Sequence, residues 1–550
     1  MSISMLEGDS KGTLGFDPTA LKAKYRFERD KRLREDGNEQ YQEVVNEFAD
    51  YNEDPYTERT ERDPLNDEVQ IAIVGGGFGG LLMGGRLKEA GFDDVRVIEK
   101  AGDFGGTWYW NRYPGARCDV ESMQYSYSFS KELQQEWDWP EIFSAQPDIL
   151  KYANHVASRF DLRRNIEFNT TVMAAHFDEN TERWSIKTDK EENVSAQFFI
   201  MATGCISTTQ IPKFKGLDDY QGDTYHTGAW PHGEVDLKSK SVAVIGTGSS
   251  GIQAIPVISE QAGHVTVFQR TPNYSLPAQN GPMTEEYAKS WKDDYPALRK
   301  QQRQSSKGVL GEYCDQSGIG ADEVEREAIY EERWAKGGTT LLGAYRDMMT
   351  EAEVNETAAQ FVRDKIHKIV QNQEVAKTLA ATGYPIGTKR ICVDSRYFET
   401  FNRDNVDLVN INQTPIISIT QTGIQTSEKS YDFDTIVFAT GFDAMTGTLF
   451  KVDIQGRAGS KLKDKWYAGP RTYLGLMSEA FPNLFMITGP GSPSVLSNMM
   501  VSIEQHVEWV TDAMEYMRQQ NLAAMEPELQ AENEWVEHVN VVAHTTLFPK

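Results

Sequence analysis

The alternation of apolar and polar positions changes near residue 66. The first 65 residues are highly charged and helix-permissive, as in KAKYRFERDKRLREDGNEQYQEVV, until NEDPYTERTERDP interrupts them. From residue 69 the chain reads VQIAIV, GGGFGG, LLMGGRLKEAG and VRVIEK, an order that predicts strand, turn, helix and strand. We expect residues 1–65 to be an N-terminal extension, either a surface arm or one that serves dimerisation or shapes a substrate entrance.

The same order of segments returns as SVAVI, GTGSSG, IQAIPVISEQAG and VTVFQR. Two such units predict an α/β protein with two doubly wound, Rossmann-like dinucleotide-binding domains. A further helix is expected from Met499 to about Arg518. We predict a first domain from residues 66–208 and 441–550, a second domain from 209–280 and 386–440, and a helical insertion in the second domain at 281–385.

The first glycine turn has the spacing Gly75-x-Gly77-x-x-Gly80 between a predicted strand and a predicted helix. Its glycines allow a tight turn, a close approach to a pyrophosphate and close packing of the helix on the strand. Glu99 ends the second strand, where a carboxylate accepts hydrogen bonds from ribose hydroxyls and repels a 2′-phosphate. The first domain is therefore expected to bind FAD or NAD.

The second turn, Gly246-x-Gly248-x-x-Gly251, is followed at the same spacing by Arg270 and then by Thr271. A guanidinium at this position suits the 2′-phosphate of NADP, although a solvated surface arginine is the alternative. Small residues after two further predicted strands, in MATGC and FATGF, leave room for dinucleotides. The pair of sites indicates FAD and NADPH in one polypeptide.

Composition narrows the class of partner. The chain has 550 residues and a formal net charge of -26, which disfavours binding to nucleic acid or to anionic lipid. Its four cysteines lack metal-ligand spacing, so no metal site is expected. No basic-then-apolar leader and no apolar run of membrane-spanning length are present, so we expect a cytoplasmic protein, a monomer or a weak homo-oligomer.

Two longer motifs point to a family. The segment from Gly105 to Asp119 fits G-G-x-W-x-x-x-x-Y-P-G-x-x-x-D, and Tyr220, Gly222, His226, Trp230 and Pro231 fit F-x-G-x-x-x-H-x-x-x-W-P with tyrosine first. Over about residues 66–550 the chain resembles Baeyer–Villiger monooxygenases, most closely the phenylacetone and steroid monooxygenase branch. The resemblance implies an FAD enzyme that uses NADPH and O2 to insert oxygen next to a ketone carbonyl, through a C4a-peroxyflavin, giving an ester or lactone.

The resemblance also assigns site residues. It makes Arg390 the cation that stabilises the peroxide and polarises the ketone, Asp119 the carboxylate that orients it, and Lys389 a contact of the NADP 2′-phosphate. By itself Arg390 is one arginine among many, and Asp119 has a loop cap as its alternative. The implied FAD contacts are Thr107, Trp108, Tyr125, Val172 and Met499. The implied NADP contacts are Thr247, Gly248, Ser249, Ser250, Gly251, Gln253, Arg270 and Thr271.

The stretch 219–232 lies between the two predicted domains. We expect it to act as a hinge, with Gly222 allowing a bend and His226 and Trp230 tying that bend to both domains. The hinge would couple movement of the NADP domain to the switch between flavin reduction and oxygen transfer.

Two other functions remain open. One is a flavin N- or S-monooxygenase, which Trp230-Pro231 and the longer motif disfavour, and the other is a non-catalytic or uncoupled flavoprotein, which the presence of Arg390 and Asp119 disfavours. The resemblance also predicts further chain after Lys550, with a tryptophan-bearing segment and a final strand of the FAD domain. We expect a longer protein with a mobile tail, the alternative being a site that lacks this closing piece.

Overall fold

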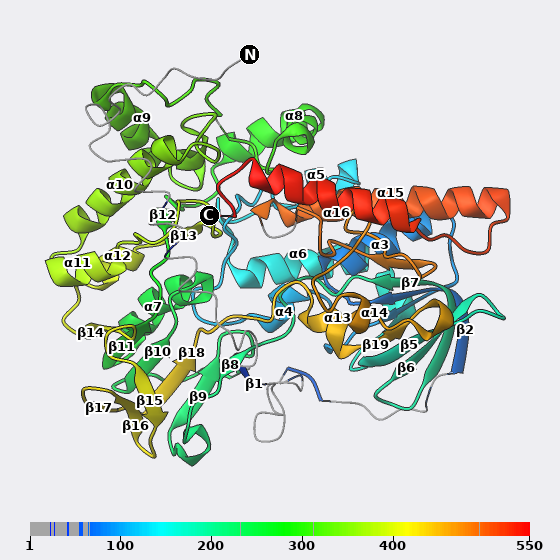
Figure 1. The fold of residues 1–550 in the computed structure, drawn as a ribbon, viewed down its shortest axis with the longest axis horizontal. Helices are drawn as coiled ribbons and strands as arrows, with labels where there is room; N and C mark the ends of the chain where they lie inside the picture. The colour runs from blue at the N-terminus through cyan, green and yellow to red at the C-terminus, as the bar shows by residue number, and fades with distance from the viewer. Residues whose placement is uncertain are drawn as a thin grey trace.

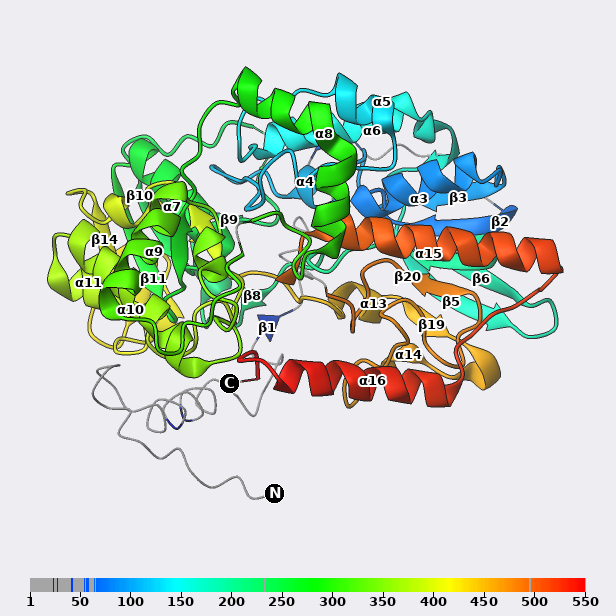
Figure 2. The ribbon, with the colours of Figure 1, turned by 90° about the horizontal axis from the view of Figure 1, so that it is seen from above.

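The computed structural model describes residues 66–549 apart from 232, 312, 494 and 495. Before residue 66 it describes residues 23, 27, 41, 42, 54, 56–58 and 64. Most of the predicted N-terminal extension therefore lies outside the described residues. Two lobes make up the molecule, one at each side of the first two views, and each contains a β-sheet (Figures 1 and 2).

The first lobe is built on a mixed sheet. Within the described residues its strand order is β19 (Asp453–Gln455), β5 (Val172–Asp178), β6 (Arg183–Thr188), β7 (Asn193–Met201), β2 (Asn66–Val74), β3 (Val95–Ile98) and β4 (Ile166–Glu167), with β20 (Leu484–Met486) also paired to β7. Strands β7, β2, β3 and β4 run parallel, whereas β6 is antiparallel to both β5 and β7. The predicted βαβ unit is β2, α3 (Phe78–Glu89) and β3.

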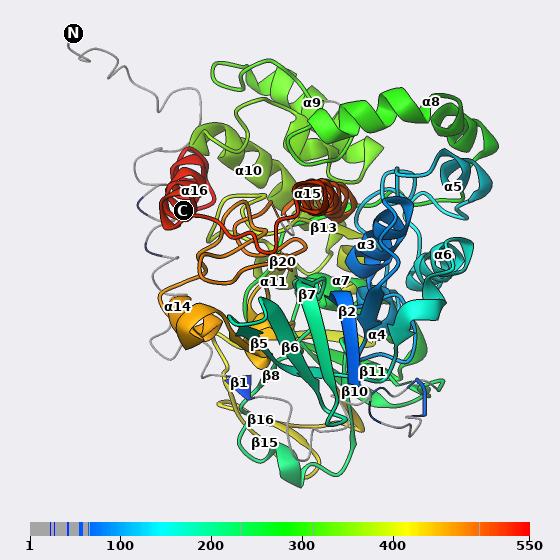
Figure 3. The ribbon, with the colours of Figure 1, turned by 90° about the vertical axis from the view of Figure 1, so that its right-hand side faces the viewer.

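Apolar side chains of β2 alternate between the two faces of this sheet. Ile71 and Ile73 enter a core with helices α3, α6 (Gln146–Arg159) and α15 (Met499–Gln520), and Ala72 enters a second core on the other face. This alternation follows from the two-residue period of a strand. Figure 3 shows α3 and α6 on one side of β2 and β7, with α14 (Leu462–Lys465) on the other.

The second lobe contains a parallel sheet. Its order is β14 (Val406–Asn410), β11 (His264–Gln269), β10 (Ser241–Ile245), β18 (Thr435–Phe438) and β9 (Asp223–His226). One face is covered by α7 (Ser249–Gln261), α10 (Ala352–Ile369), α11 (Gln373–Leu379) and α12 (Tyr397–Thr400). The other face is covered by the small antiparallel sheet of β15 (Ile416–Ile419), β16 (Gly423–Thr426) and β17 (Ser430–Asp432).

The helical segment after β12 (Ser275–Pro277) divides its packing between the two lobes. Trp291 and Tyr295 of α8 (Glu285–Gln304) join the core of the first lobe, and Arg303 pairs with Glu504 of α15. Helices α9 (Glu323–Lys336) and α10 join the core of the second lobe instead. The sequence pattern placed this whole segment in the second domain; by packing, α8 belongs to the first (Figure 2).

Part of the predicted hinge is a regular strand. Residues 223–226 form β9, which pairs in parallel with β18 so that His226 lies opposite Phe438. The stretch is thus built into one edge of the second sheet, instead of crossing freely between the lobes. Its other end contacts the N-terminal part of the chain, because the Tyr56 hydroxyl donates to the Trp230 carbonyl oxygen.

In the described part of the chain, no helix combines the length and the apolar character needed to cross a membrane. Its four cysteines are free thiols, and no group of metal-ligating side chains occurs among the described residues. The remaining helices are α4 (Thr107–Trp110), α5 (Lys131–Glu136), α13 (Gly447–Lys451) and α16 (Leu529–His544), and two short pairs of strands are β1 (Tyr41–Gln42) with β8 (Ile211–Pro212) and β12 with β13 (Cys392–Asp394).

Candidate active site

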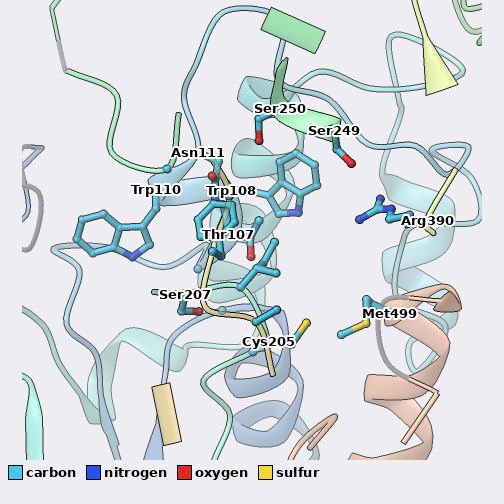
Figure 4. Close-up of a pocket in the computed structure, with 18 of the residues that line it drawn as sticks. Thr107, Trp108, Trp110, Asn111, Cys205, Ser207, Ser249, Ser250, Arg390 and Met499 are labelled. Carbon is cyan, nitrogen blue, oxygen red and sulfur yellow. The ribbon is translucent and has the colours of Figure 1, made fainter. Parts of the chain in front are cut away.

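A cavity of about 1710 Å³ lies where the two lobes meet. Its walls include both glycine turns, the segment around α4, the loop before β13 and the start of α15. In Figure 4, Ser249, Ser250, Arg390 and Met499 surround the same space as Trp108. Most of the predicted cofactor-binding residues line this one cavity, namely Gly75, Gly77, Glu99, Thr107, Trp108, Asp119, Tyr125, Val172, Met499, Thr247, Gly248, Ser249, Ser250, Gln253, Arg270, Thr271, Lys389 and Arg390.

The first glycine turn is shaped by close backbone contacts. Val74 at the end of β2 lies opposite Met201 at the end of β7, which places Gly75 beside Ala202. Gly75 has a φ of +111°, and a Cβ there would collide with the Ala202 carbonyl group. A Cβ on Gly80 would strike the Gly75 carbonyl oxygen. The turn therefore needs glycine at both positions, and its free amides at the start of α3 form a cradle that fits a pyrophosphate.

Glu99 closes the ribose end of this cradle. Its carboxylate accepts hydrogen bonds from the backbone N–H groups of Gly76 and Ala101, the latter at 2.6 Å. The side chain is 6% exposed, and burial raises the pKa of its carboxyl while the two N–H donors act to lower that pKa. Since it borders the cavity and keeps acceptor sites, Glu99 fits a pair of ribose hydroxyls.

The second glycine turn repeats the geometry of the first. Ile245 at the end of β10 lies opposite Phe438 at the end of β18, and Gly246, with a φ of +112°, contacts Ala439. A Cβ on Gly251 would strike the Gly246 carbonyl group. A Cβ on Gly248 would meet no protein atom within 4 Å, so this position faces open space above the start of α7. The open space fits a second dinucleotide.

The basic residues predicted near the 2′-phosphate come from two segments. Arg270 directly follows β11 and is exposed at the cavity wall, with Thr271 beside it. Lys389 precedes Arg390, and its ammonium lies over the Tyr384 ring, 4.3 Å from the ring centre. Both segments border the second turn's side of the cavity, which gives that side positive charge in a strongly acidic protein.

Arg390 and Asp119 form an ion pair between the lobes. Arg390 Nη2 lies 3.0 Å from Asp119 Oδ2, and the side chains are 45% and 6% exposed respectively. Burial raises the pKa of the Asp119 carboxyl, while the Arg390 charge acts to lower it. Desolvation acts to lower the pKa of Arg390, but the Asp119 charge opposes it and the net direction is upward. The guanidinium is therefore a permanent cation that faces the cavity.

Gln253 makes a second contact from the second lobe to Asp119. From the first turns of α7 its Nε2 donates to Asp119 Oδ1 and to the Arg117 carbonyl oxygen, both at 3.1 Å. Its Oε1 accepts from the Tyr113 hydroxyl at 2.7 Å and from the Arg117 N–H at 3.3 Å. All hydrogen-bonding capacity of the Gln253 amide is thus used on the Tyr-Pro-Gly loop of the first lobe. The side chain lies between that loop and the helix that follows the second glycine turn.

Aromatic and apolar groups cover the wall near the first turn. Trp108 Nε1 donates to the Tyr125 hydroxyl at 3.1 Å, and the two rings meet edge to face. Burial raises the pKa of the Tyr125 hydroxyl, so it stays protonated. Val172 begins β5, Met499 begins α15, and Thr107 begins α4 beside Gly106, so three helix or strand ends meet at this wall.

Five of the predicted residues lie off the cavity. Gly80 and Gly251 contact the preceding turns inside their helices. Gly222, His226 and Trp230 do not line the cavity either. His226 is fully buried, where its Nδ1 accepts from the Gly228 N–H at 3.0 Å, and burial lowers its pKa to about 4. A neutral, buried imidazole of this kind stabilises the local fold of the stretch 219–232.

Several cavity residues were not found from the sequence. Cys205 and Ser207 follow β7, Lys100 and Trp110 lie near Glu99, and Lys307 follows α8. The MATGC strand end was the signal for the first two, because residues just after a parallel strand face the ligand edge of the sheet. Lys307 lies in a loop without motif, and no local signal marks it.

Comparisons with known proteins agree with this geometry. Residues 72–291 match the pyridine nucleotide-disulphide oxidoreductase family model. A Baeyer–Villiger monooxygenase from Pseudooceanicola batsensis is 40% identical over 88% of this chain and 88% of its own length.

Solved structures give the same result. An oxidised steroid monooxygenase bound to NADP is 49% identical, with a TM-score of 0.85 over 88% of this chain and 92% of its own. A structure of OTEMO in complex with FAD and NADP is 38% identical, with a TM-score of 0.85 over 88% and 92%. The predicted fold class, both cofactors and the family are confirmed. The chain belongs to the Baeyer–Villiger monooxygenases, FAD-containing enzymes that use NADPH to insert oxygen next to a ketone carbonyl.

Proposed function

We propose that Arg390 is the catalytic cation of this oxygen insertion and that Asp119 positions it. The observation that carries the assignment is the 3.0 Å ion pair at the meeting of the two lobes, with the guanidinium half exposed toward the cavity. Arginine stays charged at neutral pH. Arg390 therefore donates hydrogen bonds to the ketone oxygen and stabilises negative charge at the reacting centre without giving up a proton.

The two glycine turns would hold the two cofactors. FAD would lie along Gly75 and Gly77 with its ribose on Glu99, and its ring would contact Thr107, Trp108, Tyr125, Val172 and Met499. NADPH would lie along the turn from Thr247 to Gly251, contacting Gln253, Arg270, Thr271 and Lys389. Bound FAD, once reduced by NADPH, supplies the activation of O2. The protein's own part is to orient the reactants, exclude water and fix positive charge.

The stretch 219–232 is proposed to transmit movement between the lobes. Support comes from its two attachments: β9 pairs with β18 of the second lobe, and the Trp230 carbonyl oxygen accepts from Tyr56. The second substrate is O2, the first is a ketone, and the working unit is a monomer or a weak homo-oligomer.

The assignment of Arg390 is tested by separating reduction from oxygen transfer. The holoenzyme is incubated with NADPH, O2 and a cyclic or aryl ketone, and ester, hydrogen peroxide and flavin absorbance are followed. Arg390→Ala should still allow flavin reduction but lower ester formation by at least about a hundredfold, as expected for loss of a charge stabiliser. Arg396→Ala is the matched control, since Arg396 is an exposed arginine whose side chain is 79% accessible.

Two outcomes would contradict the proposal. Retained ester formation in Arg390→Ala would remove this residue from the catalytic role. Rapid NADPH oxidation by the unaltered enzyme with hydrogen peroxide as the only product would count against the reaction itself.

A further inference from the structure

Lys307 lies on the cavity wall in the loop that follows α8. Its backbone carbonyl oxygen accepts from Asn498 N at 2.8 Å, and the next carbonyl oxygen, that of Gly308, accepts from Gln302 Nε2 at 3.0 Å. The loop is therefore fixed at both sides, by α8 and by the residue that precedes α15. Lys307 has a defined position on the wall.

Among the described residues no hydrogen bond or ion pair of the Lys307 side chain is found, whereas Arg390 and Arg117 on the cavity wall each have an ion pair. Desolvation lowers the pKa of Lys307, and no charge among the described residues is found to act on that pKa in either direction. A cation that has lost much of its hydration without gaining an anion favours an anionic ligand.

The loop also places Lys307 on the wall where the ketone is proposed to react. Leu310 N donates to Gln124 Oε1 at 2.6 Å, and Asn498 Nδ2 donates to the Gln124 carbonyl oxygen at 2.8 Å. Gln124 directly precedes Tyr125, and Asn498 directly precedes Met499. Met499 faces the same space as Arg390 (Figure 4).

The start of α15 adds to the positive potential at this wall. The helix runs from Met499 to Gln520, and its first-turn N–H groups carry a partial positive charge. Its first turn contains no acidic side chain. Lys307 and this helix end thus add positive charge to a wall that also holds the Arg390–Asp119 ion pair and Glu121.

We propose that Lys307 is a specificity-determining residue that selects ketones carrying a carboxylate group at a distance from the carbonyl. The carboxylate pairs with the Lys307 ammonium while Arg390 contacts the ketone oxygen. The carboxylate gives the ammonium an ion-pair partner that the described residues do not provide. The ammonium in turn offsets the desolvation of the carboxylate. This inference rests on the proposed position of the reacting ketone and adds a substrate class to it.

The test compares methyl-ketone carboxylic acids of increasing chain length with the matching primary amides, which have nearly the same shape and no charge. In the unaltered holoenzyme kcat/KM should favour the acid at one chain length, which reports the distance between Lys307 and Arg390. Lys307→Met should lower kcat/KM for that acid by about tenfold or more and change the amide less than about twofold. Lys307→Arg should keep the preference for the acid.

Lys300→Met is the matched control, because Lys300 is an exposed lysine of α8. It should alter neither substrate, and the KM for NADPH should be the same in all variants. Equal loss for acid and amide in Lys307→Met, a raised KM for NADPH in that variant, or equal kcat/KM for acid and amide in the unaltered enzyme would each overturn the inference. Failure of the unaltered enzyme to oxidise any of these ketones would instead count against the proposed position of the reacting ketone.

Discussion

Gly248 and Gly251 stand three positions apart, but a Cβ atom at each position would meet different surroundings. A Cβ on Gly251 would strike the Gly246 carbonyl group, whereas a Cβ on Gly248 would enter open space. Gly248 also has a φ of -80°, which any residue adopts. The constraint at Gly251 is therefore internal to the fold, whereas at Gly248 we expect the constraint to come from the proposed dinucleotide.

This difference gives a prediction for two alanine variants. Gly248→Ala should keep the midpoint of thermal unfolding of the cofactor-free protein within about 2 °C but raise the KM for NADPH by about tenfold, because the methyl group occupies dinucleotide space. Gly251→Ala should lower the unfolding midpoint itself. Calorimetry and steady-state kinetics on both variants check this. An unchanged KM in Gly248→Ala would contradict the placement of NADPH on this turn.

At the residue scale, motif spacing was informative and isolated residues were not. Glu99, Arg390 and Asp119 were found because each stands at a fixed distance from glycines or within a longer motif. Lys307 could not be found in this way, because its place in the cavity depends on how distant segments meet. The Arg390–Asp119 contact joins residues 271 positions apart, and only the three-dimensional fold gives its 3.0 Å distance.

At the scale of elements, β9 is secured by a buried histidine. His226 Nδ1 accepts from Gly228 N–H, its Nε2 lies 3.3 Å from the Gln210 carbonyl oxygen, and its backbone pairs with β18. Burial lowers the pKa of His226 from 6.5 to about 4. The unfolded chain therefore takes up a proton below pH 6.5 that the folded protein does not.

The sign of this linkage predicts acid sensitivity. Stability from neutral His226 is present above pH 6.5 and is lost as the pH falls from 6.5 toward 4, by up to about 3 kcal/mol in total. Replacing His226 by Asn should make the unfolding midpoint less dependent on pH in this window. His264→Asn, at a position whose side chain is 41% exposed, controls for substitution as such. An identical pH dependence in His226→Asn and the unaltered protein would refute the assignment.

The same variant bears on the hinge. If 219–232 transmits movement, His226→Asn should reduce the ester formed per NADPH more than it reduces FAD content. The sequence predicted a connector with a bend here. Strand β9 has only four residues, which is too short for an alternating pattern of apolar and polar positions to identify it. A strand this short is defined by its partner β18, which is more than 200 positions away in the chain.

The placement of α8 has a similar explanation. Its spacing of apolar residues indicates that one face is buried, and Trp291 and Tyr295 do lie on that face. Amphipathicity alone does not show which of two neighbouring cores the buried face of α8 packs against. The sequence therefore predicted the helix but not the lobe on which it packs.

At the scale of the whole molecule, Gln253 joins the lobes at the Arg390–Asp119 pair. It donates to Asp119 from α7, so any separation of the lobes at this point removes a buried hydrogen bond from the carboxylate. Gln253 and Arg390 both belong to the second lobe, so these two contacts of the Asp119 carboxylate depend on the position of that lobe. We therefore expect closure of the two lobes and assembly of the charged pair to occur together.

Gln253→Glu tests this connection. The new carboxylate cannot donate to Asp119 and adds like charge beside it, so the lobes should be pushed apart locally. We expect kcat/KM for the ketone to fall by about tenfold and the yield of hydrogen peroxide per NADPH to rise. Gln261→Glu, which adds the same charge at the exposed end of α7, is the control. Full coupling in Gln253→Glu would show that Asp119 does not depend on this contact.

The ion pair across the lobes also matters for engineering by recombination. A chimera that takes one lobe from this protein and the other from a relative inherits the carboxylate from one parent and the guanidinium from the other. Each parental half can fold with a complete glycine turn and still meet its new partner with the two charges out of reach. The 3.0 Å separation of Arg390 and Asp119 is therefore a design criterion for choosing crossover points, ahead of overall sequence similarity.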